Sequence, residues 1–181
     1  MHAAEYAAEH AAETASPVVI RRRTDGDSYE RMTEILHAAY ARLAAMNLRY
    51  KAVDQPASVT QERAESGECF VAEIDGRLVG TVTLYPAGLP AVACDWYRRG
   101  DVAILSQFAV DPSLQARGIG RRMIAALEDR ARAVGASEIA LDTAEPATHL
   151  VDWYTRLGFR FIEYVQWGHT NYRTVILSKS L

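Results

Sequence analysis

Apolar residues recur along the chain with two alternating periods, which predicts that strands and helices alternate. A first strand is predicted over Val18–Arg23, and an amphipathic helix over Asp27–Ala45. The larger apolar residues of that helix share one face, namely Met32, Ile35, Leu36, Ala39 and Leu43. A second, shorter helix is predicted over Thr60–Glu65. The connection over Met46–Val59 is polar and aromatic, which is typical of either a binding loop or a mobile one.

A β-hairpin gives the clearest signal in the middle of the chain. The β-rich segments Cys69–Ile74 and Leu78–Tyr85 flank Asp75-Gly76, and glycine supplies the positive φ that a tight turn needs. A loop over Pro86–Gly100 follows. The segment Val102–Val110 is nearly all apolar, so we expect a strand that is covered on both faces of the sheet.

The C-terminal half continues the alternation. A helix is predicted over Ile119–Val134, with Gly135 as its stop and with Ile119, Met123, Ile124, Leu127, Ala131 and Val134 facing inward. The remaining predicted elements are a strand over Glu138–Asp142, a helix over Pro146–Leu157 that ends at Gly158, and a hairpin of strands over Phe159–Gln166 and Tyr172–Ser178. The order β-α-α-β-β-β-α-β-α-β-β predicts one mixed α/β domain over residues 18–181.

Residues 1–17 differ from the rest, because Ala-Ala-Glu-x occurs there three times in succession before Ser16-Pro17. Alanine favours helix, but Glu5, Glu9 and Glu13 place like charges four residues apart, and so short a helix is marginal by itself. We therefore interpret this segment as a tail that is frayed or that lies on a partner subunit.

Composition excludes several classes of function. The chain has 181 residues and a formal net charge of −3, whereas a general nucleic-acid binder needs a basic excess to neutralise phosphates. Cys69 and Cys94 lack the spacing of a redox or metal pair, and the five histidines form no metal-binding cluster, so no metal is predicted. No apolar run reaches the roughly 18 residues of a membrane span and no signal segment is recognised, so we expect a soluble, cytoplasmic protein.

The segment Gln115–Gly120 (QARGIG) lies between the predicted strand over Val102–Val110 and the helix that follows it. Its glycines allow the backbone to approach an anion closely, and a helix N-terminus favours negative charge. The segment has no G-x-x-x-x-G-K-[ST] pattern, and its G-x-G lacks the third glycine of the dinucleotide fingerprint. A pyrophosphate-binding turn and an ordinary helix entrance both fit these residues when they are taken alone.

A second motif follows further along the chain, where Trp153–Phe159 reads Trp-Tyr-Thr-Arg-Leu-Gly-Phe. Together with Q-x-x-G-x-G after a strand that ends Phe-Ala-Val-Asp-Pro, it resembles the acyl-CoA motif of the GNAT superfamily of N-acetyltransferases. The resemblance covers about Val18–Lys179 in the order of elements and is specific over Leu105–Phe161. It implies the acyl-CoA N-acyltransferase fold, with a mixed, mostly antiparallel central sheet and helices on both faces.

The resemblance also implies acetyl-CoA as co-substrate and assigns the residues that contact it. Backbone groups of a strand edge pair with the pantetheine arm, at Phe108, Ala109 and Val110. Backbone N–H groups hold the pyrophosphate, at Gln115, Ala116, Arg117, Gly118, Ile119 and Gly120. Arg117 and Arg121, with Arg122 as a third candidate, add positive charge near the phosphates. The alternative for these arginines is a solvated helix face paired with Glu128 and Asp129.

Acetyl transfer to an amine needs a base, a donor to the oxyanion and an acid. An amine with a lysine-like pKa of about 10.4 must lose a proton before its nitrogen attacks the thioester. A backbone N–H at the end of Phe108–Val110 is the candidate donor to the carbonyl oxygen. Tyr154 matches the tyrosine that protonates the departing thiolate in many relatives. A packed tyrosine of the core is the alternative for this residue.

The general base is left open by the resemblance. Many relatives carry a glutamate early in the strand before the pyrophosphate turn, whereas this chain reads Val102-Ala103-Ile104 at that place. The candidates are Glu73 and Asp101, with Asp142 or a water held by Ser106 or Gln107 as further alternatives.

The acceptor is expected where three variable segments converge, at residues 46–59, 86–100 and 167–171. Aromatic walls suit an amine through cation–π contact, and the residues available for them are Tyr50, Trp96, Tyr97, His169 and Tyr172. The resemblance thus implies an N-acetyltransferase that uses a primary amine of a small molecule or peptide, by direct attack in a ternary complex. A non-catalytic acyl-CoA-binding or sensor module is the alternative, and another acyl group or an oxygen nucleophile is a third option. The alanine-rich tail and the frequent pairing of family members suggest a homodimer.

Overall fold

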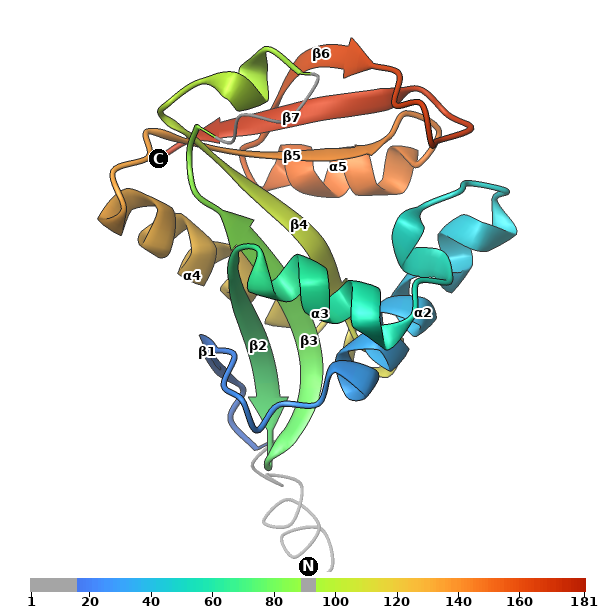
Figure 1. Cartoon of the computed structure of the whole chain (residues 1–181), viewed down its shortest axis with the longest axis vertical. Coiled ribbons are helices and arrows are strands. Elements are labelled where there is room, and N and C mark those ends of the chain that lie inside the picture. The colour runs from blue at the N-terminus through green and yellow to red at the C-terminus, as the bar shows by residue number, and fades with distance from the viewer. Residues whose placement is uncertain (1–15, 89–93) are drawn as a thin grey trace, which may run out of the picture.

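A single seven-stranded sheet organises the part of the chain that the computed structural model describes, residues 16–88 and 94–181 (Figure 1). The order of strands is β1-β2-β3-β4-β5-β7-β6. The strands are β1 (Val19–Arg22), β2 (Glu68–Ile74), β3 (Arg77–Tyr85), β4 (Val102–Val110), β5 (Glu138–Ala144), β6 (Arg160–Val165) and β7 (Thr174–Ser180). All neighbours pair antiparallel except β4 and β5, which are parallel. The predicted mixed, mostly antiparallel sheet is therefore confirmed.

Four α-helices and three short 3₁₀ helices connect these strands in the described part of the chain. The α-helices are α2 (Tyr29–Ala45), α3 (Ala57–Glu65), α4 (Ile119–Ala133) and α5 (Thr148–Arg156). The 3₁₀ helices are η1 (Lys51–Val53), η2 (Trp96–Arg98) and η3 (Pro112–Leu114). Helix α2 begins where Ser28 accepts a hydrogen bond from the backbone N–H of Arg31, the usual device of an N-cap serine.

The connection between α2 and α3 is more structured than the sequence predicts. Helix α3 begins at Ala57, three residues before the predicted start, because Pro56 has the extended backbone of an N-cap residue and its missing N–H costs nothing there. Only Thr60 and Ala64 of α3 are buried, so its apolar pattern is weak. Within the predicted loop, Tyr50 also starts the 3₁₀ turn η1.

The last strand begins and ends two residues later than the sequence predicts. It runs over Thr174–Ser180 instead of Tyr172–Ser178. The turn before it extends through Tyr172, whose carbonyl oxygen accepts a hydrogen bond from the Thr170 hydroxyl. At its other end, Ser180 still pairs with Glu138 of β5. Two predicted segments lie partly outside the described residues. They are the tail over residues 1–17, of which 1–15 are not described, and the loop over Pro86–Gly100, of which 89–93 are not described.

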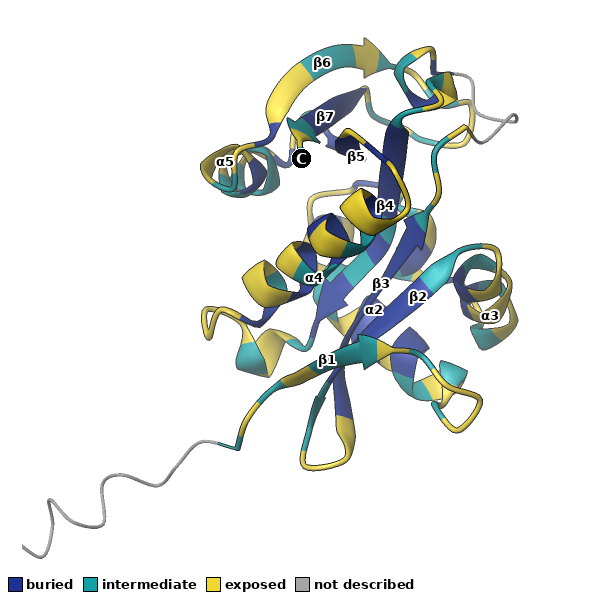
Figure 2. Cartoon of the chain, turned by 90° about the vertical axis from the view of Figure 1, so that its left-hand side faces the viewer, coloured by how far each residue is buried: buried dark blue, intermediate teal, exposed yellow. Residues whose placement is uncertain are grey.

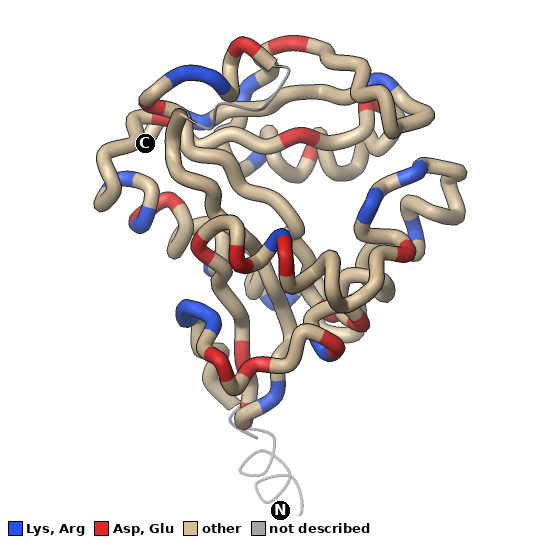
Figure 3. Tube along the Cα trace, in the orientation of Figure 1, with Lys and Arg blue, Asp and Glu red and all other residues tan. Residues whose placement is uncertain are grey.

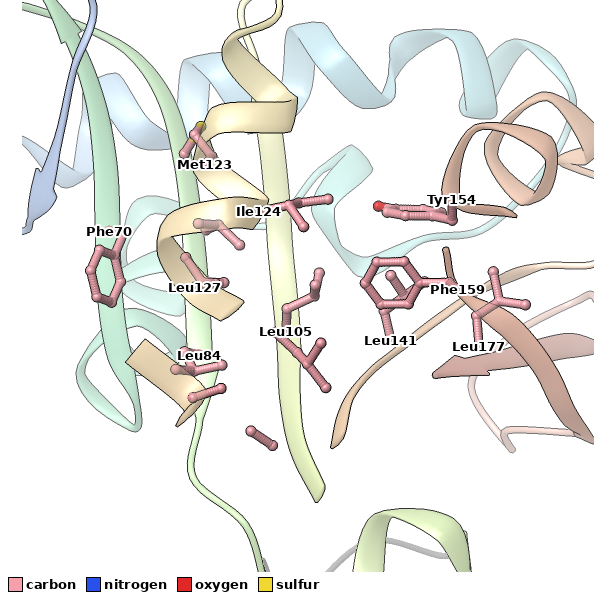
Figure 4. Packing of buried hydrophobic residues seen from close by; sticks show 14 of the residues in the cluster. Phe70, Leu84, Leu105, Met123, Ile124, Leu127, Leu141, Tyr154, Phe159 and Leu177 are labelled. Atoms are coloured by element: carbon pink, nitrogen blue, oxygen red, sulfur yellow. The ribbon is translucent and has the colours of Figure 1, made fainter. Parts of the chain in front are cut away.

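Helices cover both faces of the sheet (Figure 2). Helices α4 and α5 pack on one face, where Met123, Leu127 and Tyr154 join a large apolar cluster. Helices α2 and α3 cover the other face, against residues of β2 and β3. The core around β4 and β5 includes Leu105, Leu141, Tyr154 and Phe159, which lie together in Figure 4.

Gly80 of β3 allows α4 to lie close to the sheet. A Cβ atom there would lie 2.8 Å from Sδ of Met123 and 3.2 Å from the carbonyl oxygen of Ala109 on β4. We expect Gly80→Ala to lower the free energy of unfolding by about 1–2 kcal/mol, because overpacking outweighs what alanine gains over glycine in a strand. Urea unfolding measures this change. In the control Gly100→Ala the new methyl meets open space, so its effect stays within about 0.5 kcal/mol; equal effects of both variants would contradict the packing argument.

Candidate functional site

Strands β4 and β5 separate after a short stretch of pairing, and the site lies where they part. Their register runs only from Val102 opposite Glu138 to Ile104 opposite Ala140. Within the described residues, β4 has no partner on its β5 side beyond Ile104, and Figure 1 shows the two strands diverging. Because an unpaired strand edge offers backbone donors and acceptors, this edge can bind an extended ligand.

A β-bulge marks the point of separation on β4. Thr81 of β3 pairs with Ala109, but Thr83 pairs with Ser106, so Val82 faces two residues of β4. One of them, Gln107, has a φ of 52°, which is uncommon for a residue other than glycine. The side-chain amide of Gln107 is buried and accepts a hydrogen bond from Gln55 at 2.8 Å. The bulge redirects the strand from Phe108 onward.

Two adjoining cavities occupy the gap between β4 and β5. The α4-side cavity has a volume of about 580 Å³ and is lined by the turn before α4 and by α5. The loop-side cavity has a volume of about 470 Å³ and is lined by η1, α3 and the β6–β7 turn. Five residues line both cavities: Tyr40, Tyr50, Phe108, Asp142 and Tyr154. A molecule in one cavity therefore meets a molecule in the other at these five side chains.

The turn before α4 has the geometry of an anion site. Ala116 and Gly118 have φ angles of 63° and 77°, and Gly118 caps α4 without a side-chain hydrogen bond. The first N–H groups of a helix lack intrahelical partners, and the helix dipole adds positive potential there. Residues of the predicted turn line the α4-side cavity, namely Gln115, Ala116, Gly118, Ile119, Gly120 and Arg121. This arrangement fits a pyrophosphate.

Gly120 lies against the aromatic pair that closes the α4-side cavity. A Cβ atom at Gly120 would lie 3.2 Å from Cζ of Phe108 and 3.5 Å from the Trp153 ring. The rings of Phe108 and Trp153 stack with centroids 5.9 Å apart. The glycine thus lets α4 approach β4 and α5 beside the turn, and it brings the two sequence motifs into contact.

The three arginines of this region have different surroundings. Arg121 lines the α4-side cavity, whereas Arg117 is not among its lining residues. Arg122 donates a hydrogen bond to the carbonyl oxygen of Val18 at 2.7 Å, which directs it away from the turn. The acidic residues considered as partners pair elsewhere, Glu128 with Lys179 and Asp129 with Arg132.

Tyr154 lies at the edge of the core and reaches the junction of the two cavities. Its ring makes edge contacts with Trp153 and Phe159, with centroids 4.9 Å and 5.7 Å apart. Figure 4 shows its hydroxyl directed away from α5 toward β4. Burial raises the pKa of the Tyr154 phenol well above 10. The phenol therefore keeps its proton over the whole neutral and mildly alkaline range.

Asp142 faces Tyr154 across the same junction. The side chain of Asp142 is exposed to solvent in the cavities that it lines, but the protein around it leaves its carboxylate partly desolvated, which raises the pKa of Asp142. A hydrogen bond from the Tyr97 hydroxyl at 3.3 Å and the charge of Arg63 offset part of the effect. A carboxylate whose pKa is raised above its ordinary value is a stronger base than one in water.

Glu73 and Asp101, the two candidates for the base that the sequence favours, line neither cavity. Glu73 binds Arg21 at 2.6 Å on the outer part of β2. Asp101 accepts hydrogen bonds from Arg99 and Ser137 at the start of β4, which lowers its pKa to about 2. Both carboxylates are thus engaged in ion pairs, and neither lies in the cavities that Tyr154 lines.

The three variable segments converge on the loop-side cavity, as expected. Tyr50, Tyr97, His169 and Tyr172 line it, whereas Trp96 lies outside it and stacks against Arg99. Several further residues line this cavity without having been predicted to do so from the sequence, namely Tyr40, Lys51, Arg63, Tyr85 and Trp167. Tyr40 could have been found from the sequence, because it follows Ala39 on the apolar face of the predicted helix. Arg63 could not, because no local pattern distinguishes it from a surface arginine.

Side chains bridge the open gap on the loop side. The hydroxyl of Tyr50 accepts a hydrogen bond from the N–H of Ala144 at 2.7 Å, which satisfies a donor of β5 beyond its pairing with β4. Asn171 in the β6–β7 turn donates to the carbonyl of Asn47 at 2.7 Å and accepts from the N–H of Arg49 at 2.9 Å. These contacts form a clasp between the α2–η1 loop and the β6–β7 turn.

Other kinds of site have little support in the described residues. Within residues 16–88 and 94–181, no three His, Cys, Asp or Glu side chains gather as a metal site would require, and Cys69 and Cys94 are free thiols. None of the helices in this part of the chain has the length and apolarity needed to cross a membrane. In Figure 3 acidic and basic positions are interspersed along the chain.

The chain resembles known acetyltransferases in sequence and in structure. It is 26% identical over 140 residues to S-(2-succino)cysteine N-acetyltransferase of Bacillus subtilis, covering 72% of this chain and 77% of that protein. It is 36% identical over 112 residues to mycothiol acetyltransferase of Sanguibacter keddieii, covering 61% of this chain but only 34% of that protein.

Solved structures of acetyltransferases share the fold. A GNAT family acetyltransferase from Elizabethkingia anophelis, solved with acetyl-CoA bound, superposes with a TM-score of 0.62 at 17% identity and covers 91% of this chain and 98% of that one. An acetyltransferase of Bacillus subtilis, solved in complex with CoA, gives 0.63 at 19% identity, with coverage of 91% and 99%. Residues 29–159 match the acetyltransferase (GNAT) family. The chain therefore belongs to the GNAT family of acetyltransferases.

Proposed function

We propose that this protein transfers an acetyl group from acetyl-CoA to a primary amine of a small molecule or peptide, by direct attack in a ternary complex. One observation carries the proposal: Tyr154 and Asp142 line both cavities, so an acid and a base lie where the two substrates meet. In this scheme the α4-side cavity binds the CoA moiety and the loop-side cavity binds the amine. The names of the two relatives, an N-acetyltransferase of a cysteine derivative and a mycothiol acetyltransferase, support a small acceptor.

The residues around the α4-side cavity supply the contacts that CoA needs. The unpaired edge of β4 at Phe108, Ala109 and Val110 offers hydrogen bonds to an extended pantetheine arm. The N–H groups of the turn over Gln115–Gly120 hold the pyrophosphate, and Arg121 adds positive charge. A backbone N–H near Phe108 then donates to the carbonyl oxygen as negative charge develops on it.

The reaction requires a proton to leave the amine and a proton to reach the sulfur. Asp142 accepts a proton from the ammonium, directly or through a water in the cavity, and the free amine attacks the carbonyl carbon. The nitrogen–carbon bond forms, the carbon–sulfur bond breaks, and the nitrogen releases its second proton. Tyr154 donates its proton to the departing thiolate, and the second proton released by the nitrogen then reprotonates the phenol. One net proton leaves with the products.

The raised pKa of Tyr154 defines how this residue acts. A phenol whose pKa is well above that of a thiol, which is about 8.5, remains a donor at every working pH. Tyr154 therefore stabilises the thiolate mainly by a hydrogen bond in the transition state, and complete transfer of the proton follows as the nitrogen is deprotonated.

Removing the phenol tests the role of Tyr154. We expect Tyr154→Phe to lower kcat by about 100-fold, in the range typical of a general acid, while CoA affinity stays within about threefold because the ring and its packing remain. Release of free thiol from acetyl-CoA with a panel of amines gives kcat, and calorimetry gives CoA affinity. Tyr164 is exposed on β6 and lines neither cavity, so Tyr164→Phe is the matched control. CoA binding without turnover of any amine by the native protein would instead favour a non-catalytic CoA-binding module.

A second prediction concerns the pH dependence that Asp142 imposes. Activity requires its carboxylate form, so kcat/KM rises as the pH passes through its raised pKa, in addition to the rise from the amine itself. We expect Asp142→Asn to lower kcat/KM by about 100-fold at pH 7 and to remove that inflection. The difference from the native protein narrows at high pH, where the amine is already deprotonated.

Stability measurements separate this role of Asp142 from a structural one. Its folded pKa lies above the ordinary 3.8, so ionisation of Asp142 destabilises the fold once the pH rises past the folded pKa. The Asn variant is then at least as stable as the native protein at pH 8. A variant that is less stable at pH 8 and shows an unchanged pH–rate profile would exclude Asp142 as the base.

A further inference from the structure

Arg63 of α3 presents to the loop-side cavity a guanidinium that makes no direct ion pair, although its charge acts on Asp142 across the cavity. Its Nη1 donates to Oε1 of Gln55 at 2.8 Å, and its Nη2 donates to Oγ of Ser106 at 3.1 Å. Both acceptors are neutral. Among the described residues Arg63 forms no ion pair, whereas five other arginines that are packed against the fold each bind a carboxylate, namely Arg21, Arg31, Arg130, Arg160 and Arg173.

A buried polar network fixes the position of Arg63. The side chain of Gln55 is 3% exposed, and its Nε2 donates to Oγ1 of Thr60 and to Oε1 of Gln107, both at 2.8 Å. These two bonds orient the Gln55 amide so that its oxygen faces Arg63. The Tyr85 hydroxyl also donates to the backbone carbonyl of Arg63 at 2.9 Å. Satisfied networks of this kind hold a side chain in one geometry.

Arg63 keeps several hydrogen-bond donors for a ligand. A guanidinium has five N–H groups in a planar fork, and only two of them are used by Gln55 and Ser106. Carboxylates are the common partners of such a fork, because two parallel N–H···O bonds match the two carboxylate oxygens. An ammonium group is repelled by this guanidinium, and a neutral amine offers it one uncharged acceptor atom instead of the two charged oxygens of a carboxylate.

The charges of the loop-side cavity are separated in a way that matches a bifunctional acceptor. Asp142 lies at the junction with the α4-side cavity, where the amine must react, while Arg63 and Lys51 line the loop-side cavity alone. The cavity therefore has an anionic pole near the reaction point and an excess of positive charge elsewhere.

We propose that the acceptor is an amine that also carries a carboxylate, such as an amino acid or an amino-acid derivative, and that Arg63 binds this carboxylate while the amine faces Asp142. This inference rests on the proposed function and narrows its substrate class. Arg63 is a specificity-determining residue in this scheme: it contacts the acceptor but takes no part in proton transfer. Simple amines and acceptors that present no carboxylate near the amine are then poor substrates.

Matched acceptor pairs that differ by one carboxylate test the proposal. The pairs are phenylalanine with 2-phenylethylamine, leucine with 3-methylbutylamine, and 6-aminohexanoate with pentylamine, which vary the distance between amine and carboxylate. We expect the native protein to prefer the carboxylated member of at least one pair by about 10- to 100-fold in kcat/KM, as the loss of a charge-assisted hydrogen bond predicts. Equal kcat/KM values within every pair would overturn the proposal.

Substitution of Arg63 assigns the preference to this residue. Arg63→Met keeps the apolar stem, and we expect it to reduce kcat/KM for the carboxylated member by about 10- to 100-fold while the uncharged member changes less than about threefold. Arg63→Lys keeps the charge without the fork and recovers part of the preference. Arg49→Met, on the neighbouring loop and outside both cavities, controls for a general loss of positive charge. If Arg63→Met slows both members equally, the residue has a structural role only.

A binding measurement keeps this test separate from that of the proposed function. If no amine is turned over, the proposed function fails, but the acceptor pairs can still be titrated calorimetrically into the CoA-loaded protein. Tighter binding of the carboxylated member by the native protein, lost in Arg63→Met, supports the carboxylate site by itself. Equal binding of both members, or binding of neither, contradicts it.

Discussion

The parting of β4 and β5 is the constraint on which the rest of the structure depends. Two neighbouring parallel strands normally satisfy each other's backbone groups along their whole length, but here pairing stops at Ile104 and Ala140. The backbone groups beyond that point need other partners, because unpaired polar groups are costly once they are buried. Tyr50 supplies one partner to β5 at Ala144. On β4, the bulge at Gln107 redirects the remaining edge at the α4-side cavity, where the CoA of the proposed reaction would complete the pairing.

The polar groups beside this gap divide into two sets with opposite roles. Gln55, Thr60 and Gln107 bond to one another inside the protein and remain shielded from water, so they maintain the shape of the bulge and of α3. Asp142, Tyr154 and Arg63 instead reach the cavities with part of their bonding capacity unused. The first set gives the second a fixed geometry, which matters because catalysis and recognition both depend on groups that do not need to reorganise.

The sequence predicts the fold and the residues around the turn before α4 better than those of the loop-side cavity, for a physical reason. The conformations of Gln115–Gly120 and Trp153–Phe159 depend on local backbone geometry and helix periodicity. Their pattern can therefore be recognised from consecutive residues of the sequence. Arg63 and Asp142 acquire their character from distant residues: Ser106 is 43 positions from Arg63, and Tyr97 is 45 positions from Asp142. Glu73 and Asp101 are plausible bases until the structure shows the arginines that bind them. The early start of α3 at Ala57 was missed because a helix with two buried residues has almost no apolar period.

The clasp between Asn171 and the α2–η1 loop has a consequence for the rate at which an acceptor enters. It consists of two hydrogen bonds between exposed groups, each worth about 0.5–1.5 kcal/mol net. Contact between the rings of Tyr50 and Tyr172, with centroids 5.0 Å apart, adds about 0.5–1.5 kcal/mol. Separation of the two loops therefore costs about 1.5–4.5 kcal/mol, which corresponds to an open fraction on the order of 0.1–10% at equilibrium. Loops that move on this energy scale do so in microseconds to milliseconds. The two loops are thus joined in the average structure, yet they separate often enough for the loop-side cavity to widen within the time of a typical turnover.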